Sequence, residues 1–230
     1  MVELSTSFEA AWERFQALDS LQLAGDSVEL EQSHGRAQLL AFLVRIEDSA
    51  VRRHAEGVLA RLTNIPGIEP YPPEYWHITV KLAGYQVIKR TREDDVLRQE
   101  VGRLGREAAA LLGTRAAYAA RIGLPNAFPD ALILEVHDEA VTRQMNTLLL
   151  EGLGSVASNP FDGATFLPHI SIARFTSNAG LDQLKATLAE LREEGPGPEF
   201  PIRRVEFVKA WLSEETPDLE TLASYPLAAS

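Results

Sequence analysis

Apolar positions recur along this chain at two different spacings, which predict alternating helices and strands. From Ser5 to about Asp19, apolar side chains return every three to four positions, as on one face of an amphipathic helix. The run AQLLAFLVRI (37–46) predicts a buried strand, and a helix from Ser49 to about Leu62 follows it. The proline-rich segment IPGIEPYPP (65–73) predicts irregular backbone.

The rest of the chain continues this alternation. We expect strands over 75–82, 117–124, 131–137 and 167–175 and from Val205 to Leu212, and helices over 93–112, 139–150 and 180–193. Residues 21–35 are expected to form a loop. The chain should therefore divide into an N-terminal helical extension, residues 1–36, and a single domain, residues 37–230.

Two of the predicted strands carry the same four-residue pattern, HITV from His77 and HISI from His169. Because side chains alternate along a strand, each histidine shares a face with the hydroxyl two residues later, Thr79 or Ser171. The motifs lie 92 positions apart, one in each half of the chain. This spacing predicts a loose internal duplication, in which two α+β lobes place their motif strands on either side of a central cleft.

Composition narrows the class of protein. The chain has 230 residues and no cysteine, which excludes disulfides and thiolate chemistry. Its net charge of -11 argues against a surface for long duplex nucleic acid, although one basic pocket could still bind a nucleotide or an RNA end. There is no apolar run of membrane-spanning length and no secretory signal, so a cytoplasmic location without membrane attachment is expected.

Histidines and hydroxyls on two strands provide the groups that phosphoryl transfer requires. One imidazole can accept a proton and the other can donate one, while the hydroxyls stabilise charge on phosphate oxygens. Each motif alone is better explained as a half-buried strand histidine, but the repetition favours catalysis. The remaining histidines lack the pattern, and we expect His54 and His137 to be structural or surface residues.

Further residues are candidates for substrate binding. Lys81 should point the same way as His77 and Thr79 if that strand stays regular, whereas Arg174 is out of phase with His169 unless a bulge intervenes. A lysine at a strand end is equally compatible with a solvated role. Aromatic candidates for stacking on a base, each more often a core residue, are Phe128, Tyr85 and Trp211.

Competing chemistries have less support in the sequence. A zinc site would need a third ligand, and the chain contains neither HExxH nor HxH, so no metal and no cofactor are expected. The G-x-S-x-G motif of serine hydrolases is absent, as are a phosphate-binding G-x-x-x-x-G-K-[ST] loop and a dinucleotide fingerprint.

With these motifs, the chain resembles the two-histidine phosphoesterase superfamily, in its 2'-5' RNA ligase-like and cyclic phosphodiesterase branch. The resemblance covers about residues 37–228 and includes AFLVRI, PEYWHITVKLAG, FPDALILEV and FLPHISIARF, where Pro168 precedes the second histidine. It implies an α+β fold of two pseudo-symmetric lobes, each an antiparallel sheet with outer helices, around a central cleft. It also implies no required metal.

By this resemblance the catalytic set is His77, Thr79, His169 and Ser171, and the substrates are 2',3'-cyclic phosphates of nucleotides or RNA ends. We expect hydrolysis to 2'-phosphates, with His169 as base and His77 as acid, although the sequence alone does not assign these roles. Action on 2'-5' linkages is also implied. The alternatives are a nucleotide-binding or sensor protein with little turnover, and an interaction protein that docks through its N-terminal helix. The acidic charge favours a small cyclic nucleotide or a short oligonucleotide end as partner.

Overall fold

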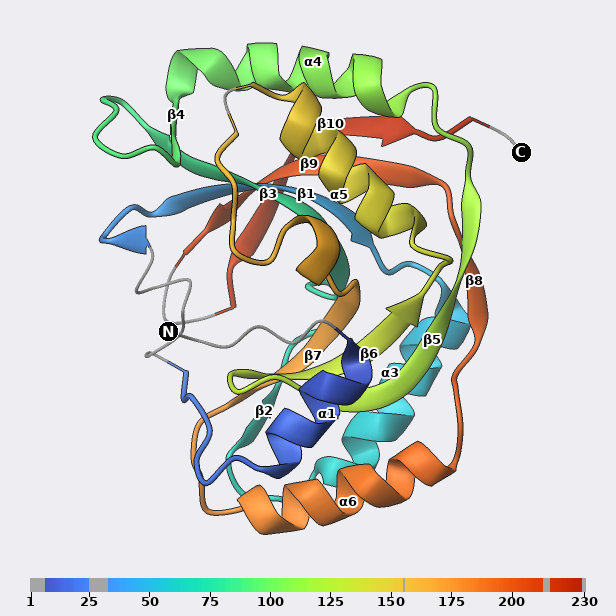
Figure 1. Cartoon of the computed structure of the whole chain (residues 1–230). Coiled ribbons are helices and arrows are strands. Elements are labelled where there is room, and N and C mark those ends of the chain that lie inside the picture. The colour runs from blue at the N-terminus through green and yellow to red at the C-terminus, as the bar shows by residue number, and fades with distance from the viewer. Residues whose placement is uncertain (1–6, 25–32, 155, 213–215, 229–230) are drawn as a thin grey trace.

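One curled sheet organises the protein, shown in Figure 1 as a computed structural model. The structure describes residues 7–24, 33–154, 156–212 and 216–228. Within these ranges, eight strands form the path β10-β9-β1-β3-β7-β6-β5-β8, and two short strands pair beside it, β2 on β7 and β4 on β3. Except for the parallel pair of β3 and β4, neighbouring strands run antiparallel.

The strands are β1 (Gln38–Arg45), β2 (Ile68–Pro70), β3 (His77–Val87), β4 (Asp95–Leu97), β5 (Tyr118–Ala127), β6 (Ala131–His137), β7 (His169–Phe175), β8 (Glu199–Ile202), β9 (Arg204–Trp211) and β10 (Asp218–Pro226). The helices are α1 (Phe8–Gln16), α3 (Ser49–Leu62), α4 (Val101–Leu112), α5 (Val141–Gly152) and α6 (Leu181–Glu193), with short 3-10 turns at Arg98–Glu100 and Gly163–Thr165.

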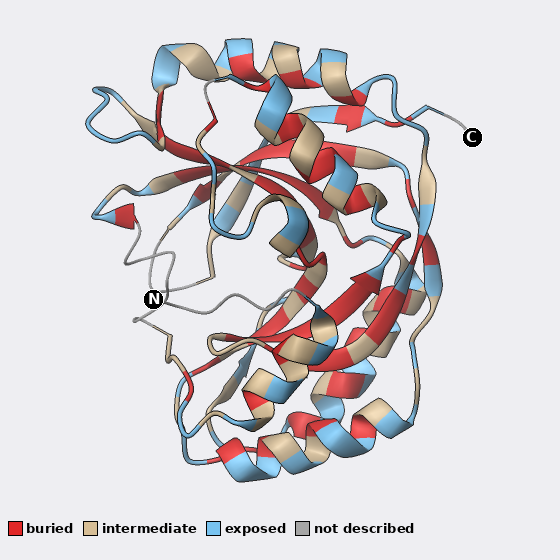
Figure 2. Cartoon of the chain, viewed as in Figure 1, coloured by how far each residue is buried: buried red, intermediate tan, exposed pale blue. Residues whose placement is uncertain are grey.

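The sheet divides into two lobes with helices packed on each. The first lobe contains β10, β9, β1 and β3 and is covered by α4 and α5; the second contains β7, β6, β5 and β8, with α3, α6 and α1 packed against it (Figure 1). Apolar residues spaced three or four apart bury one side of each helix, as Leu181, Leu184, Leu188 and Leu191 do in α6. Figure 2 shows buried segments on the helices and along most of the length of the central strands. This arrangement confirms the expected α+β fold of two lobes with antiparallel sheets.

The two motif strands lie side by side, which differs from the facing arrangement expected from the sequence. β3 and β7 are neighbours in the sheet and pair antiparallel at a single point, Ile78 with Ile170. The two lobes therefore meet at the motifs themselves.

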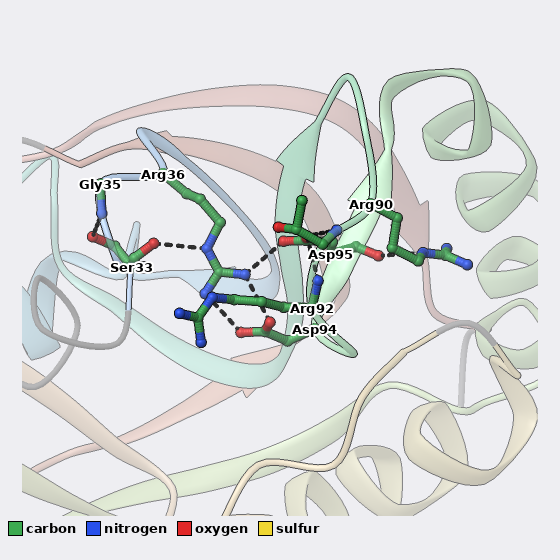
Figure 3. Close-up of polar contacts among 8 residues, drawn as sticks. Ser33, Gly35, Arg36, Arg90, Arg92, Asp94 and Asp95 are labelled. Carbon is green, nitrogen blue, oxygen red and sulfur yellow. Dashed lines mark hydrogen bonds and ion pairs between the residues drawn. The ribbon is translucent and has the colours of Figure 1, made fainter.

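Several boundaries differ from the prediction for physical reasons. The helix expected from residue 93 begins only at Val101, because the buried carboxylate of Asp95 accepts hydrogen bonds from the N–H groups of Thr91 and Arg92 and holds the preceding residues in a turn (Figure 3). Within the segment 65–73, expected to be irregular, Ile68–Pro70 pairs with β7. Strands β8 and β10 were not expected as separate elements.

Both of the earliest helices begin where capping chemistry allows. Ser7 caps α1 by accepting a hydrogen bond from the N–H of Ala10, and the carboxylate of Asp48 caps α3. In the described part of the chain, no helix is both long and apolar enough to cross a membrane. The division into an extension over 1–36 and one domain over 37–230 remains a prediction.

Candidate active site

The pairing of β3 with β7 brings the four predicted catalytic residues together. Ile78 and Ile170 are sheet partners and are both buried. Extending this antiparallel register by one residue in each direction places His77 beside Ser171 and Thr79 beside His169. All four are only partly buried, whereas the isoleucines between them point into the core. We call the side of the sheet that carries these four residues the histidine face.

The two histidines make the same backbone contact. His77 Nδ1 lies 2.5 Å from the carbonyl oxygen of Tyr75, and His169 Nδ1 lies 2.7 Å from that of Leu167. A carbonyl can only accept, so each Nδ1 carries the hydrogen. In the neutral imidazole the lone pair is then on Nε2, which is the atom left for proton transfer.

An aromatic ring packs edge-on against each imidazole. Tyr75 and His77 have ring centroids 5.0 Å apart at 88°, and Phe128 and His169 have centroids 4.9 Å apart at 87°. Tyr75 is a neighbour of its histidine in sequence, but Phe128 comes from the turn between β5 and β6. The structure thus places Phe128 next to the second histidine, and its role in substrate binding stays a prediction.

A bulge in each motif strand changes which residues share the histidine face. On β3, Thr79 pairs with Leu43 but Lys81 pairs with Phe42, so the two side chains point to opposite faces of the sheet. On β7, Ser171 pairs with Ile133 and Arg174 with Ala131, which places Arg174 on the histidine face. The predicted direction of Lys81 is therefore wrong, and the bulge that Arg174 required is present.

Lys81 is withdrawn from the candidate binding residues because it is buried on the other face. Its side chain is 0% exposed, and its ammonium lies 2.8 Å from Asp162 Oδ2 and donates to the carbonyls of Leu82 and Ala157. Burial lowers its pKa, while the hydrogen bond and charge of Asp162 oppose that shift. Asn146 on α5 donates to Asp162 and to the carbonyl of Val80, so this side chain links α5 both to the ion pair and to β3.

The other two aromatic candidates are Tyr85, which is covered by another side chain, and Trp211, which is on the opposite face of the sheet from the histidines. The guanidinium of Arg36 lies 3.8 Å from the centre of the Tyr85 ring and is itself held by Asp94 and Asp95, the cluster shown in Figure 3. Trp211 is 42% exposed, but its sheet partner Gln38 lies out of phase with the β1 residues on the histidine face. Neither placement supports stacking of a base beside the motifs.

Two charged residues near the histidines were missed from the sequence. Arg45 is the β1 partner of His77, and it is held by Glu206 at 2.8 Å and by the Leu219 carbonyl at 2.9 Å. Asp130 lies in the turn that carries Phe128, and its charge acts on His169. The only sequence signal for Arg45 was a charge near the end of an apolar run, and its register with His77 could not be predicted.

The surroundings disfavour the charged form of both histidines. Burial lowers the pKa of His77 to about 4, and the charges of His169 and Arg45 add to this effect against the Tyr75 carbonyl. Burial also lowers the pKa of His169, but the Leu167 carbonyl and the negative charge of Asp130 oppose the shift. Both imidazoles are therefore in the neutral form near neutral pH, in which Nε2 can accept a proton. Among the described residues, no group of three or more His, Cys, Asp or Glu is placed to hold a metal ion.

Paired histidines and hydroxyls on adjacent strands of a bilobal antiparallel sheet are the arrangement of a two-histidine phosphoesterase. A sequence model of the 2'-5' RNA ligase superfamily matches residues 39–210, and the chain belongs to this family. Membership supports phosphoesterase activity in general. No curated protein sequence matches the chain closely enough to indicate a nearer relative.

Solved structures share the fold at low sequence identity. TT0787 of Thermus thermophilus is 19% identical with a TM-score of 0.60, and the match covers 82% of this chain and 97% of that one. Apo LigT of E. coli is 14% identical with a TM-score of 0.58, covering 84% and 99%. LigT complexed with 3'-AMP is 12% identical with a TM-score of 0.57 and the same coverage.

Proposed function

We propose that this protein is a metal-independent phosphodiesterase that hydrolyses 2',3'-cyclic phosphates of nucleotides or RNA ends, giving 2'-phosphates. One observation carries the proposal: both histidines hold their Nδ1 hydrogen on a backbone carbonyl and so keep Nε2 for proton transfer. A phosphate bound between the motifs would meet a base and an acid together. Cleavage of 2'-5' linkages would use the same groups.

The reaction proceeds as one displacement at phosphorus. Nε2 of one histidine takes a proton from water, and the water oxygen forms a bond to phosphorus. The bond from phosphorus to the 3' oxygen breaks, and the other histidine, protonated, gives its proton to that oxygen. The hydroxyls of Thr79 and Ser171 donate hydrogen bonds to the non-bridging oxygens, where negative charge collects in the transition state.

Unlike charges beside the two histidines favour His77 as the base and His169 as the acid in hydrolysis, the reverse of the order expected from the sequence. The positive charge of Arg45 disfavours a proton on His77, whereas the negative charge of Asp130 favours one on His169. Bound phosphate adds a negative charge near both imidazoles and raises both pKa values. His169, on which Asp130 favours a proton, is then the protonated histidine in the complex.

Substrate contacts follow from the residues beside the second motif. Arg174 shares the face of Ser171 and is held by Glu69 at 2.6 Å, and this supports its guanidinium as a ligand for a phosphate oxygen or a ribose hydroxyl. Phe128 offers an aromatic edge next to His169. The complexes of E. coli LigT with 3'-AMP, ATP and NADP+ support a small nucleotide as ligand.

Hydrolysis of 2',3'-cyclic nucleotides in EDTA tests the proposal, with 2'- and 3'-phosphate products separated. We expect turnover by the wild-type protein, and a loss of roughly 100-fold or more in kcat for His77→Ala and for His169→Ala. Removing the hydroxyl of Thr79 or Ser171 should cost about 10- to 1000-fold. The matched control is His34→Asn, because His34 is an exposed histidine outside both motifs.

Three results would contradict this function. Normal turnover by a folded His77→Ala variant would exclude general acid–base catalysis by the pair. Activity that disappears in EDTA and returns with added metal would exclude the metal-independent scheme. A wild-type protein that binds cyclic nucleotides without hydrolysing them would be a nucleotide sensor.

A further inference from the structure

Helix α1 and residues 21–24, which precede the family-matched region 39–210, lie along the second lobe. In α1, Ala11 and Phe15 are buried, and Asn126 of β5 donates to the carbonyl of Phe8. At the other end of the helix, the ammonium of Lys185 on α6 donates to the carbonyl of Leu18. Helix α1 is thus fixed to both β5 and α6.

After α1, the segment Leu21–Ala24, which we call the strap, is held by three backbone N–H groups. Leu21 donates to Asn178 Oδ1 at 2.6 Å, Gln22 to the carbonyl of Pro129 at 2.7 Å, and Ala24 to the carbonyl of Phe175 at 2.6 Å. Pro129 lies in the turn between β5 and β6, and Phe175 is the last residue of β7. The strap therefore joins that turn to the end of the second motif strand.

The turn held by the strap affects the second histidine through the residues on both sides of Pro129. Phe128 packs edge-on against the His169 ring, and the charge of Asp130 acts on the same imidazole. The turn closes through the Phe128 N–H, which donates to the carbonyl of Ala131 at 2.9 Å. Movement of this turn would change the packing and the charge around His169 together.

The aromatic neighbour of the first histidine comes from the same stretch of chain. Its aromatic neighbour, Tyr75, precedes His77 by two residues, and the Tyr75 N–H is fixed locally to the carbonyl of Pro72 at 2.9 Å. Phe128, in contrast, is 41 positions from His169 and reaches it from a separate hairpin. The two halves of the site thus have the same ring contact but secure it in different ways.

We propose that the strap is a positioning element for the second catalytic histidine, because it holds the turn carrying Phe128 and Asp130 against His169. This rests on the proposed function for its effect on turnover, but not for its effect on the imidazole. A small displacement of a catalytic group can lower kcat by up to about 100-fold. Loosening the strap should therefore lower kcat, and KM can rise with it because the same turn carries Phe128.

Two variants loosen the strap without touching either motif. Asn178→Ala removes the acceptor for Leu21, and Asn178→Asp is the rescue variant because it keeps that acceptor. Gln22→Pro removes the N–H that binds Pro129 itself. The matched control is Lys185→Met, which cuts the bond to Leu18 and so loosens α1 upstream of the strap.

The deciding measurement is an NMR titration of the imidazole signals, with His77 as the internal reference. We expect the His169 signal and its titration midpoint to move in Asn178→Ala and Gln22→Pro and to return in Asn178→Asp. The change at His77 should be smaller and should arise only through the charge of His169. A His169 signal that is unmoved in Gln22→Pro would overturn the proposal. Equal movement of both histidines, or an equal effect of Lys185→Met, would also overturn it by indicating general loosening.

This measurement needs no turnover, so it separates the strap from the enzymatic activity. If His169 responds but no cyclic nucleotide is hydrolysed by any form, the proposed function fails and the positioning role stands. If the wild-type protein hydrolyses cyclic nucleotides, but kcat and the His169 signal are the same in the strap variants, the positioning role alone fails.

Discussion

Replacing His77 by Asn is expected to make the protein less sensitive to acid. Burial holds the pKa of His77 at about 4 in the folded protein, with the charges of His169 and Arg45 adding to the effect, against about 6.5 for an ordinary histidine. Between these values the unfolded chain binds a proton that the folded protein does not. The free energy of unfolding therefore falls as the pH drops through this window, and it stops falling below about pH 4.

The size of this effect follows from the difference between the two pKa values. One pKa unit corresponds to about 1.4 kcal/mol, so complete titration of His77 should cost about 3 kcal/mol of stability. At about pH 5, where the unfolded chain is largely protonated at this position, the cost should be about 2 kcal/mol. At about pH 7.5 it should be close to zero.

Urea unfolding of the wild type and of His77→Asn at these two pH values measures the effect. Asn does not titrate and its side-chain NH2 can still donate to the carbonyl of Tyr75, so the backbone contact is kept. On going to the lower pH, the variant should gain about 2 kcal/mol relative to the wild type. His169→Asn should shift in the same direction. Parallel pH dependences for His77→Asn and the wild type would refute the lowered pKa of His77.

Two further predictions test the placement of Arg174 on the histidine face and of Lys81 on the opposite face. Arg174→Ala should raise KM for cyclic nucleotides by roughly 10- to 100-fold through loss of a charged hydrogen bond, whereas Trp211→Ala should leave KM within about 2-fold; similar KM values for both would contradict the assignment. Lys81→Met should lower the free energy of unfolding by about 3–5 kcal/mol, because it leaves the carboxylate of Asp162 without its buried partner. A change below about 1 kcal/mol in urea unfolding would argue against that pair.

The sequence predicted the parts of the fold that depend on local pattern. The α3 helix begins at Ser49 after its Asp48 cap, and the buried run of β1 forms the strand expected of it. Strand β10 was missed because most of its positions are not buried, which leaves no regular apolar signal, and β8 was missed because it is short and contains Pro201. The helix expected from residue 93 starts late because Asp95 is paired with Arg36, a contact across 59 positions.

The four residues proposed to be catalytic could be placed together from the sequence, but most of their charged neighbours could not. The alternation in HITV and HISI is visible along each strand, so His77 and His169 and their hydroxyls could be placed on one face. The bulges turn Lys81 away from the histidine face and Arg174 towards it, and the alternation in the sequence does not reveal them. They are set by pairing with β1 and β6, and register between distant strands is a property of the whole sheet.

The repeated motif strands and the segments next to them make different contributions to this site. The two strands repeat the histidine, the carbonyl two residues earlier, the hydroxyl and the bulge, and this symmetry provides two equivalent groups for proton transfer. Hydrolysis needs the groups to differ, one as base and one as acid. The difference comes from adjacent segments, which place Arg45 next to His77 and Asp130 near His169. In the proposed reaction, the assignment of base and acid thus depends on residues outside both motifs, so the motifs alone indicate the histidine pair without assigning its roles.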